Sequence, residues 1–418
     1  MKAADWLDDL PKGWRGLRLK RVVSLSGQRE VEPAPDEYYV GMENIESWTG
    51  RLLERGASTP DPDEEPESKS TSNRFSPGNV LFGKLRPYLA KVWLADRAGI
   101  CSTELLVFQG RDRVYAPFLA HVLRTHEFID AVDGTTFGSR MPQADWASIG
   151  DIQIPLPPLD QQRTIADHLD RETRRIDDLI AAKLRWLDGL SEKRKALILL
   201  AVGYGITDSL SRPHEAPAHW TRMALKYACS GIRTGGTPTP EYMDADDDKD
   251  VLWFTPGDFN DGLLLADSTR KLSQESIADE QAPLYPPHTV YVVGIGATLG
   301  KVGYCSVAAS ANQQVNALLP APNTDSTFLA YRLSVAGDWM QALANSATLP
   351  ILNQQRMGEM EISLPPLAEQ RAIVAHIGAE TTKLDSLRAA TERSLALLRE
   401  RRAALVAEAV TGRLAGVV

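Results

Sequence analysis

The stretch LPPLDQQRTIADHL at residues 156–169 reappears as LPPLAEQRAIVAHI at residues 364–377, so one motif occurs twice at an offset of 208 positions. In each copy a pair of prolines follows an apolar run and precedes a long segment rich in leucine, isoleucine and charged residues. Proline disfavours helix at the residue before it, so each pair ends a strand and a helix follows. The repeated motif therefore predicts two long helices at equivalent places in a duplicated chain.

The duplication extends beyond this motif. PKGWRGLRLK (11–20) aligns with PAHWTRMALK (217–226), and NVLFGKLRPYLAKV (79–92) aligns less closely with TVYVVGIGATLGKV (289–302). The order along the chain is therefore a globular unit, a helix, a second globular unit and a second helix. We place these four segments at residues 1–155, 156–205, 206–363 and 364–418.

Both globular units combine short β-like runs with amphipathic helices. The runs at 80–82, 105–108 and 290–293 are apolar and are bounded by glycine, proline or asparagine. The segments 117–132 and 327–343 have the pattern of amphipathic helices at matching places in the two units. The predicted fold class is α+β, with two pseudo-symmetric α+β domains separated by two long helices.

The two helical segments carry apolar residues at a seven-residue spacing, which is typical of a seam packed against another helix. The first line of the seam contains Leu169, Ile176, Leu190 and Leu197 in one helix and Ile377, Leu384, Leu398 and Leu405 in the other, interrupted by Lys183 and Thr391. The second line contains Ile165, Leu179, Trp186 and Leu200 in the first helix and Ile373 and Leu387 in the second.

Chain continuity predicts how the helices pair. The first helix carries the chain from the first globular unit to the second, and domain termini usually lie close together. The second helix then starts near the end of the first and runs back. We expect an antiparallel coiled coil with an approximate twofold axis at its midpoint and one globular unit at each end.

Length and composition exclude several classes of protein. At 418 residues, roughly two to four domains are expected. No apolar run is long enough to span a bilayer and the N-terminus lacks an apolar signal segment, so we expect no membrane association. The cysteines Cys101, Cys229 and Cys305 are scattered and suit a reducing cytoplasm. We predict a cytoplasmic protein without a metal site.

The net charge of −9 argues against nucleic-acid binding, because phosphate contacts need lysine and arginine. The charge is unevenly distributed, however. Residues 68–113 contain eight basic and three acidic side chains, whereas residues 206–366 contain ten basic and eighteen acidic ones. A basic face is therefore expected in the first globular unit.

Two similar but unlike heads on a spacer suit a split DNA site. B-form DNA has twofold axes perpendicular to its length, so such a protein can contact two short tracts on one face of a duplex. Because the two units differ strongly in sequence, the two tracts should differ as well. The pattern thus predicts a reader of a bipartite, asymmetric site whose gap is set by the helices.

Several motifs resemble those of a known family. LPPLxxQR at the start of both helices, HWxxxxLK at 219–226, ILLAVGYGITD at 198–208 and VAEAVTGRLAG at 406–416 are similar to the specificity subunit of Type I restriction–modification systems. The resemblance covers essentially the whole chain. It implies two target-recognition domains joined by helical spacers, in a subunit that binds double-stranded DNA and has no catalytic activity.

The resemblance also implies partners and cofactors. Two modification (adenine methyltransferase) subunits are expected along the spacer, and restriction (translocase and nuclease) subunits are further candidates. This chain is expected to bind no cofactor, and S-adenosylmethionine, ATP and Mg²⁺ are expected on the partner subunits. The outer helix faces, including DQQR at 160–163, EQR at 369–371 and Arg174–Arg175, are either simply solvent-exposed or the docking surface for the modification subunits.

The candidate DNA contacts lie in loops of the globular units. The residues are Lys84, Arg86, Tyr88, Lys91 and Arg140 in the first unit and Arg233, Thr234 and Lys301 in the second. Arg86 is the best candidate for bidentate reading of guanine. The alternative is that these loops are solvated turns, and that Lys301, which aligns with Lys91, shares a structural role with it.

No catalytic site is predicted. VVGIGATLGK (292–301) fails the spacing of a phosphate-binding loop. The acidic segment 60–69 is too rich in proline to hold nuclease metal ligands rigidly. His168 and His376 repeat at equivalent helix positions with no cysteine or second histidine near them to complete a metal site, and no Asn-Pro-Pro-aromatic methyltransferase motif occurs.

Two other classes of function remain open. One is an enzyme with a site of its own, against which the missing nucleotide, methyltransferase and nuclease motifs argue. The other is a coiled-coil adaptor that binds only proteins. Such an adaptor would enrich no sequence from a pool of random DNA, whereas a specificity subunit would.

Overall fold

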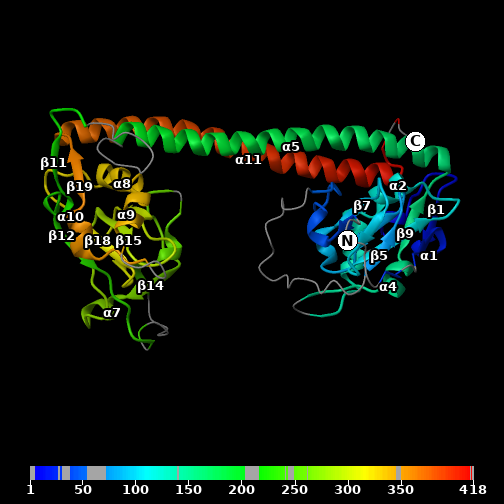
Figure 1. The fold of residues 1–418 in the computed structure, drawn as a ribbon, viewed down its shortest axis with the longest axis horizontal. Helices are drawn as coiled ribbons and strands as arrows, with labels where there is room; N and C mark the ends of the chain where they lie inside the picture. The colour runs from blue at the N-terminus through cyan, green and yellow to red at the C-terminus, as the bar shows by residue number, and fades with distance from the viewer. Residues whose placement is uncertain are drawn as a thin grey trace. The chain divides into compact units, whose positions relative to one another are not determined.

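The computed structural model describes residues 5–26, 29–30, 38–53, 72–138, 141–202, 216–240, 242, 249–260, 262–344, 350–414 and 416. The chain forms two compact units (Figure 1). Unit 1 contains Met1–Leu184 and Glu392–Val418, and unit 2 contains Arg185–Thr391. Unit 1 is therefore built from two separate stretches of sequence, between which unit 2 is inserted.

Unit 1 is a mixed α+β unit. Its strands are β1 (Arg15–Arg18), β2 (Val23–Leu25), β3 (Arg29–Glu30), β4 (Tyr39–Val40), β5 (Ser72–Phe75), β6 (Val80–Gly83), β7 (Val92–Leu94), β8 (Gly99–Cys101), β9 (Leu105–Gly110) and β10 (Gln153–Leu156). Its helices and 3-10 turns are η1 (Asp5–Leu7), α1 (Leu19–Val22), η2 (Met42–Asn44), η3 (Pro87–Leu89), α2 (Ala116–Val122), α3 (His126–Asp133), α4 (Trp146–Asp151) and the start of α5 (Leu159–Val202). The sheets have the orders β2-β9-β6-β7, β3-β5-β8-β4 and β1-β10.

The core of unit 1 forms on both sides of β6, because successive side chains of a strand point to opposite faces. Val80 and Phe82 pack in one cluster with Phe128 of α3. The rings of Phe82 and Phe128 meet edge to face with centroids 5.8 Å apart. Leu81 points to the other side, into a cluster that contains Trp93. The sheet that carries β6 is therefore buried on both faces.

Unit 2 repeats this plan. Its strands are β11 (Thr221–Ala224), β12 (Cys229–Thr234), β13 (Lys249–Phe254), β14 (Arg270–Ser273), β15 (Thr289–Val293), β16 (Val302–Cys305), β17 (Ser310–Ala311), β18 (Val315–Pro320) and β19 (Glu361–Leu364). Its helices and turns are η4 (Leu225–Tyr227), η5 (Pro256–Asp258), α7 (Gln274–Ala278), α8 (Ser326–Ser334), α9 (Gly337–Leu343), α10 (Gln354–Glu359) and the start of α11 (Leu367–Val410). The sheets have the orders β12-β18-β15-β16, β14-β13-β17 and β11-β19.

A short antiparallel ribbon closes each unit in the same way. Arg15 of β1 lies opposite Leu156 of β10, and Thr221 of β11 lies opposite Leu364 of β19. In each unit the ribbon joins the first strand to the strand that leads into the long helix. The internal duplication and the α+β class predicted from the sequence are confirmed.

The glutamine of the first LPPLxxQR motif is a buried clamp. Gln162 is completely buried. Its Oε1 accepts a hydrogen bond from the Tyr115 backbone N–H at 2.7 Å, and its Nε2 donates to the carbonyls of Arg113 at 3.0 Å and Pro157 at 2.8 Å. One side chain thereby satisfies three backbone groups and fixes the start of α5 to the loop before α2.

Gln370 makes the same clamp in unit 2. It accepts from the Asp325 N–H at 2.8 Å and donates to the carbonyls of Asn323 at 3.1 Å and Pro365 at 2.9 Å. Its exposed fraction is 1%. The expectation that DQQR and EQR lie wholly on the outer helix faces is therefore wrong for Gln162 and Gln370, because their amides match backbone groups that would otherwise be buried without partners.

The residue before each glutamine ties the opening of the unit to the helix. The indole Nε1 of Trp14 donates to Gln161 Oε1 at 2.8 Å, and that of Trp220 donates to Glu369 Oε1 at 3.0 Å. Each tryptophan comes from the segment that the repeat aligned with its counterpart. In both units, two adjacent positions of the motif therefore bind the start of the long helix: one to the tryptophan near the start of the unit and one to backbone groups of a loop.

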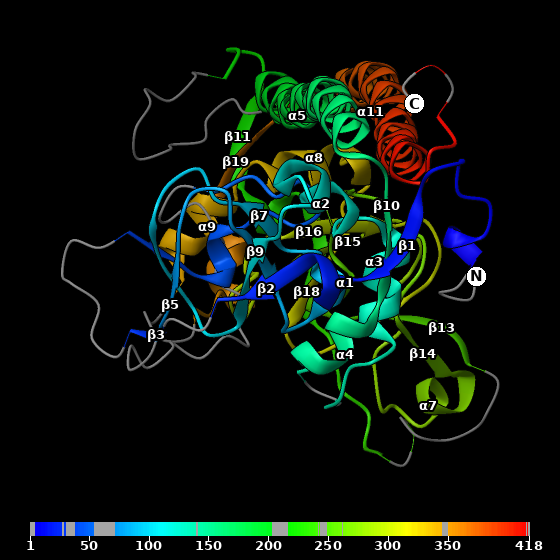
Figure 2. The same ribbon diagram turned by 90° about the vertical axis from the view of Figure 1, so that its right-hand side faces the viewer.

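In unit 1 the two long helices run antiparallel. Arg402 of α11 donates from Nε and Nη2 to the two carboxylate oxygens of Asp177 of α5, at 2.8 Å and 3.2 Å. Leu169, which precedes Asp177, shares a core cluster with Val406, which follows Arg402. Figures 1 and 2 both show these parts of α5 and α11 side by side.

In unit 2 the remaining parts of the helices are also antiparallel. Arg194 of α5 donates to Asp385 of α11 at 2.5 Å. Ile198, which follows Arg194, shares a core cluster with Ile377, which precedes Asp385. The predicted antiparallel arrangement therefore holds within each unit.

The two interhelical ion pairs are the same pair with the helices exchanged. Asp385 lies 208 positions after Asp177, and Arg402 lies 208 positions after Arg194. In unit 1 α5 supplies the aspartate, and in unit 2 it supplies the arginine. The unit 1 pair is the more buried, with side chains 14% and 11% exposed against 27% and 57% in unit 2. The unit 1 pair is therefore the less screened by solvent.

The predicted seam is partly wrong. Its residues Ile165, Leu169, Ile176, Leu190, Ile377 and Leu384 are buried, and Leu197, Ile373, Leu398 and Leu405 are half-buried. Leu179 and Leu387, assigned to the second line, are 47% and 48% exposed. Trp186 and Leu200 of the same line are also exposed.

Threonines lie on the other side of the first line from the predicted second line. Thr173 and Thr381, four residues after Leu169 and Ile377, are buried there, and the Thr173 hydroxyl donates to the Leu169 carbonyl of its own helix at 2.6 Å. A hydroxyl satisfied in this way can be buried without a partner from another helix. The positions of the apolar residues therefore predicted the second line of the seam on the wrong side of the first line.

We expect Gln162→Met to destabilise unit 1 by about 1–3 kcal/mol, because the Tyr115 N–H and two carbonyls lose their buried partner. Amide hydrogen exchange of unit 1 would measure the change, and the control is Asp167→Met on the exposed face of the same helix. Equal exchange rates in the two variants would contradict the clamp.

Candidate nucleic-acid interface

The loop between β6 and β7 carries the basic and aromatic residues predicted to contact DNA. Its first residues pair with a second loop, because Arg86 N–H donates to the Pro142 carbonyl at 2.7 Å and Ala144 N–H donates to the Lys84 carbonyl at 3.0 Å. Gln143, which lies between Pro142 and Ala144, forms one isolated β-bridge with Leu85 and another with Phe137. The structure thus brings the Lys84–Tyr88 loop against residues 142–144, which follow the candidate contact Arg140 in the sequence.

Several large side chains on these two loops face solvent. Tyr88, Phe137 and Met141 are 46%, 59% and 41% exposed, while Lys84 and Arg86 are half-buried. Arg140 lies outside the described residues, as does the acidic segment 60–69. Exposed aromatic rings next to basic groups are suited to contact with bases and phosphates.

The backbone of the loop is strained at two non-glycine residues. Arg86 and Ala90 have φ angles of +47° and +48°, in the left-handed region. The equivalent residues of unit 2 are Gly296 and Gly300, with φ angles of +97° and +90°. A side chain in this conformation costs roughly 1–2 kcal/mol. Unit 1 therefore carries an arginine and an alanine at positions where unit 2 has glycine.

Lys91 and Lys301 hold equivalent turns in place. Lys91 Nζ donates to the Met42 carbonyl in η2 at 2.8 Å, and Lys301 Nζ donates to the Phe259 carbonyl just after η5 at 3.0 Å. Both ammonium groups are thus engaged by backbone of their own unit. The shared role of the two lysines in the structure is to anchor a turn beside the candidate loop.

Arg233 and Thr234 lie at the end of β12 and are exposed. The Thr234 hydroxyl donates to Asn316 Oδ1 at 3.0 Å, and Asn316 Nδ2 donates to the Leu352 carbonyl at 3.1 Å. The glycine that follows them is closely packed, since a Cβ on Gly235 would collide with the backbone of Ala311. Thr234 is therefore linked through Asn316 to the segment that contains Leu352. Arg233 provides an exposed positive charge beside it.

Unit 2 contains a cleft at the position of the unit 1 loop. Its volume is about 580 Å³, and one wall is the segment 295–298, which corresponds to residues 85–88 of unit 1. The other walls contain Thr255, Pro256, Gly257, Thr269, Arg270, Asn312 and Gln314. Sequence reasoning missed these residues, because they come from three separate segments and form no motif.

An aspartate organises the polar side of this cleft. Asp258 Oδ2 accepts from the N–H and hydroxyl of Thr255 at 2.7 Å and 2.8 Å, and Oδ1 accepts from the N–H and hydroxyl of Thr269 at 2.8 Å and 2.7 Å. Burial raises the pKa of the Asp258 carboxyl, but these hydrogen bonds outweigh burial and lower the pKa from its usual value. The group is therefore a carboxylate at neutral pH.

The repeated histidines lie on the long helices, away from the candidate loops in sequence. His168 is half-buried and His376 is exposed. Among the described residues, no cluster of three or more His, Cys, Asp or Glu side chains has the arrangement of a metal site. Within the same described parts of the chain, every helix is too short or too polar to cross a membrane.

The sequence matches the family model described as Type I restriction modification DNA specificity domain, over residues 66–185 and 220–386. One match lies in unit 1 and the other in unit 2, and together they cover more than half of the chain. The chain therefore belongs to this family, as its motifs indicated.

Curated relatives carry related names. The chain is 26% identical to the Type I restriction enzyme EcoDI specificity subunit of Escherichia coli over 182 residues, which cover 42% of this chain and 36% of that relative. It is 22% identical to the EcoBI specificity subunit of Escherichia coli over 368 residues, which cover 81% of this chain and 74% of that relative. The first alignment thus spans only about a third of the relative.

Solved structures share the fold. A chain from a structural study of the assembly and conformational transition of the type I R-M system has a TM-score of 0.75 and 22% identity, over 97% of this chain and 100% of that one. The HsdS subunit from Thermoanaerobacter tengcongensis has a TM-score of 0.54 and 21% identity, over 99% and 100% of the two chains. These likenesses support the two-unit α+β architecture.

We expect Arg86→Gly to raise the free energy of unfolding of unit 1 by up to about 1 kcal/mol, since glycine relieves the left-handed strain. The same change should weaken binding to DNA by about tenfold or more, because a guanidinium contact is lost. Ala90→Gly is the control, because it relieves the same kind of strain and removes a buried methyl group but no group proposed to contact DNA. Denaturant titration and binding competition would measure both effects, and undiminished DNA binding of Arg86→Gly would contradict the role of Arg86.

Proposed function

We propose that this chain is the non-catalytic DNA sequence-specificity subunit of a Type I restriction–modification complex. In this role each unit reads one half of a bipartite, asymmetric site on double-stranded DNA. Membership of the specificity-domain family supports the proposal, as does the presence of one family domain in each unit. The chain itself carries out no reaction and needs no cofactor.

The observation that carries the proposal is a pair of equivalent loops with unlike side chains. Residues 84–90 and 294–300 both have positive φ angles at two aligned positions and are held by the same pairing to a second loop. Unit 1 presents Lys-Leu-Arg-Pro-Tyr on this frame, whereas unit 2 presents Gly-Ile-Gly-Ala-Thr. A shared frame with different functional groups is what two different half-sites require.

The two halves would contact DNA with different chemistry. In unit 1, Lys84, Arg86 and Tyr88 supply phosphate contacts, base-edge contacts and stacking. In unit 2, Arg233 and the residues that line the cleft supply the contacts to DNA. Lys91 in unit 1 and Lys301 in unit 2 anchor the turns beside these loops. The net charge of −9 predicts weak binding by the isolated chain, which basic partner subunits would strengthen.

The long helices would set the unread gap and carry the partner subunits. Each unit exposes large apolar side chains on its parts of α5 and α11, each at least 42% exposed: Leu179, Leu184 and Leu397 in unit 1, and Trp186, Leu199, Leu200 and Leu387 in unit 2. We assign them to the docking of two modification subunits, which bring S-adenosylmethionine, and restriction subunits with ATP and Mg²⁺ would join that core.

Selection from a random pool of duplex DNA tests the proposed function. The complex of this chain with its modification subunits should enrich two short, different sequences separated by a gap of constant length. An enzyme or a protein-only adaptor would enrich no such pair. Absence of any enriched sequence from a complex that retains methyltransferase assembly would refute the proposal.

We expect Trp186→Ser to reduce capture of the modification subunits by about tenfold or more, because a buried aromatic anchor contributes about 2 kcal/mol or more to an interface. Arg185→Ser, at the neighbouring exposed position, is the control. Co-purification of the modification subunits at matched concentrations measures the effect. Equal capture by the two variants would remove Trp186 from the docking surface.

A further inference from the structure

The unit 2 cleft presents hydrogen-bond acceptors whose direction is fixed. The Thr269 hydroxyl donates its single hydrogen to Asp258 at 2.7 Å, and the Thr255 hydroxyl donates to the same carboxylate at 2.8 Å. A hydroxyl has one hydrogen and two lone pairs. Because each hydrogen is committed to Asp258, these oxygens can only accept a hydrogen bond from a molecule in the cleft.

Thr269 is the better placed of the two acceptors. It is exposed and lines the cleft, whereas Thr255 is half-buried and its oxygen also caps the η5 turn. The Thr269 backbone N–H donates to Asp258 as well, at 2.8 Å, so the residue is held at two points. Such an arrangement fixes the acceptor before any ligand arrives.

Donors lie on the other walls of the same cleft. Asn312 and Gln314 are joined to each other, since Gln314 N–H donates to Asn312 Oδ1 at 3.0 Å and Asn312 Nδ2 donates to Gln314 Oε1 at 3.2 Å. Because Gln314 Oε1 accepts from Asn312, the NH₂ of the Gln314 amide points away from Asn312 and can donate to another group. Arg270 adds a cationic donor directly beside Thr269.

This order of acceptors and donors matches one class of base edge. In the major groove, adenine and cytosine present an exocyclic amino group, whereas guanine and thymine present a carbonyl oxygen there. An acceptor with no hydrogen to give favours the amino group and repels the carbonyl. The selectivity follows from Asp258, which keeps both hydroxyls in the accepting orientation.

We propose that unit 2 selects, at one position of its half-site, a base with a major-groove amino group, adenine or cytosine, through the hydroxyl oxygens of Thr269 and Thr255. The proposal rests on the proposed function and adds the chemistry of one half-site to it. Gln314 donates to an acceptor on the same or the neighbouring base, and Arg270 contacts the adjoining phosphate.

The equivalent turn of unit 1 lacks this chemistry. There Gly41 and Asn44 stand at the places of Thr255 and Asp258, and the turn is closed by a hydrogen bond from Gly41 N–H to Asn44 Oδ1 at 2.9 Å. Glycine has no hydroxyl, and an amide has no charge to orient one. This arrangement of oriented hydroxyls is therefore missing from the described Gly41–Asn44 turn of unit 1.

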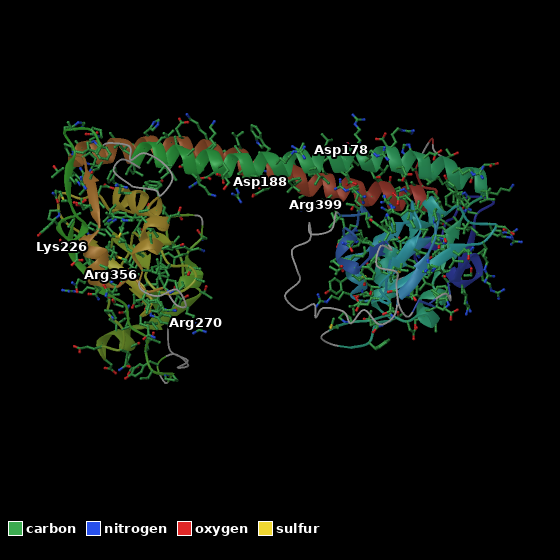
Figure 3. The ribbon with its side chains drawn as sticks, in the orientation of Figure 1. Asp178, Asp188, Lys226, Arg270, Arg356 and Arg399 are labelled. Atoms are coloured by element: carbon green, nitrogen blue, oxygen red, sulfur yellow. The ribbon has the colours of Figure 1, made fainter. Side chains whose placement is uncertain are left out.

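Figure 3 shows a suitable control position within unit 2. Arg270 and Lys226 lie at opposite ends of the unit in this view. Lys226 sits above the ring of Tyr227 at 5.2 Å, well removed from the cleft residues. Lys226→Gln therefore removes one positive charge from unit 2 without changing the cleft, as a match for Arg270→Gln.

Selection from random duplex DNA, performed with the complex that contains the modification subunits, tests the inference. Wild-type protein should prefer one base pair at one position of the unit 2 half-site, and a base analogue then identifies whether the adenine or cytosine of that pair is the contacted base. Thr269→Val removes the acceptor at nearly constant volume and should reduce that preference by about tenfold or more. Thr269→Ser restores the hydroxyl and should restore the preference. Arg270→Gln should weaken binding to all sequences alike, more than Lys226→Gln does.

A base analogue separates a direct contact from an indirect effect. Wild-type complex should bind duplex in which the selected base lacks its exocyclic amino group about tenfold or more weakly than the normal duplex. Thr269→Val should show no further loss on the analogue, because the contact is already missing. Equal losses in wild type and variant would overturn the inference.

The remaining outcomes are distinct. If removal of the exocyclic amino group leaves binding unchanged at the position where Thr269→Val has an effect, the inference is wrong and the proposed function stands. The inference is equally wrong, and the proposed function equally intact, if Thr269→Val leaves the preference at every position unchanged. If wild-type complex enriches no sequence, the proposed function fails first, and the inference fails with it.

Discussion

The architecture depends on a buried amide at the start of each long helix. Gln162 and Gln370 each satisfy three backbone groups that lie between a globular unit and its helix. A buried backbone group without a partner costs about 1–3 kcal/mol, so each glutamine strongly restricts where the helix can begin. The motif occurs twice because this junction has to be made twice.

Both units share the structural elements that follow from this junction, but they differ in the side chains on their surfaces. The ribbon, the helix start and the loop at 84–90 or 294–300 recur, and an Asp–Arg pair links α5 to α11 in each unit. What differs is the surface: an arginine and a tyrosine on a strained loop in unit 1, and a cleft lined by hydroxyls and amides in unit 2. The repeated positions thus stabilise the fold, and under the proposed function the differing surfaces carry out recognition.

The sequence alone predicted the repeat, the α+β class, the two helices and their antiparallel pairing, because these depend on periodicity and chain continuity. It misassigned Leu179 and Leu387, since the buried side of the helix carries threonines that hydrogen-bond within their own helix. It could not decide whether Lys91 and Lys301 contact DNA or anchor turns, because their carbonyl partners lie far away in sequence. The cleft could not be predicted from the sequence either, because Thr255, Thr269 and Asn312 become neighbours only through tertiary folding.

The division of unit 1 between two stretches of sequence has a consequence for synthesis. Val406, Ala409 and Val410 belong to the same core cluster as Ile165 and Leu169, yet unit 2 is translated between them. On the ribosome, unit 2 can complete its contiguous core first, while the earlier unit waits with apolar helix surface uncovered. The half made first is therefore the half finished last, and the nascent chain passes through a stage in which chaperone protection of that surface matters most.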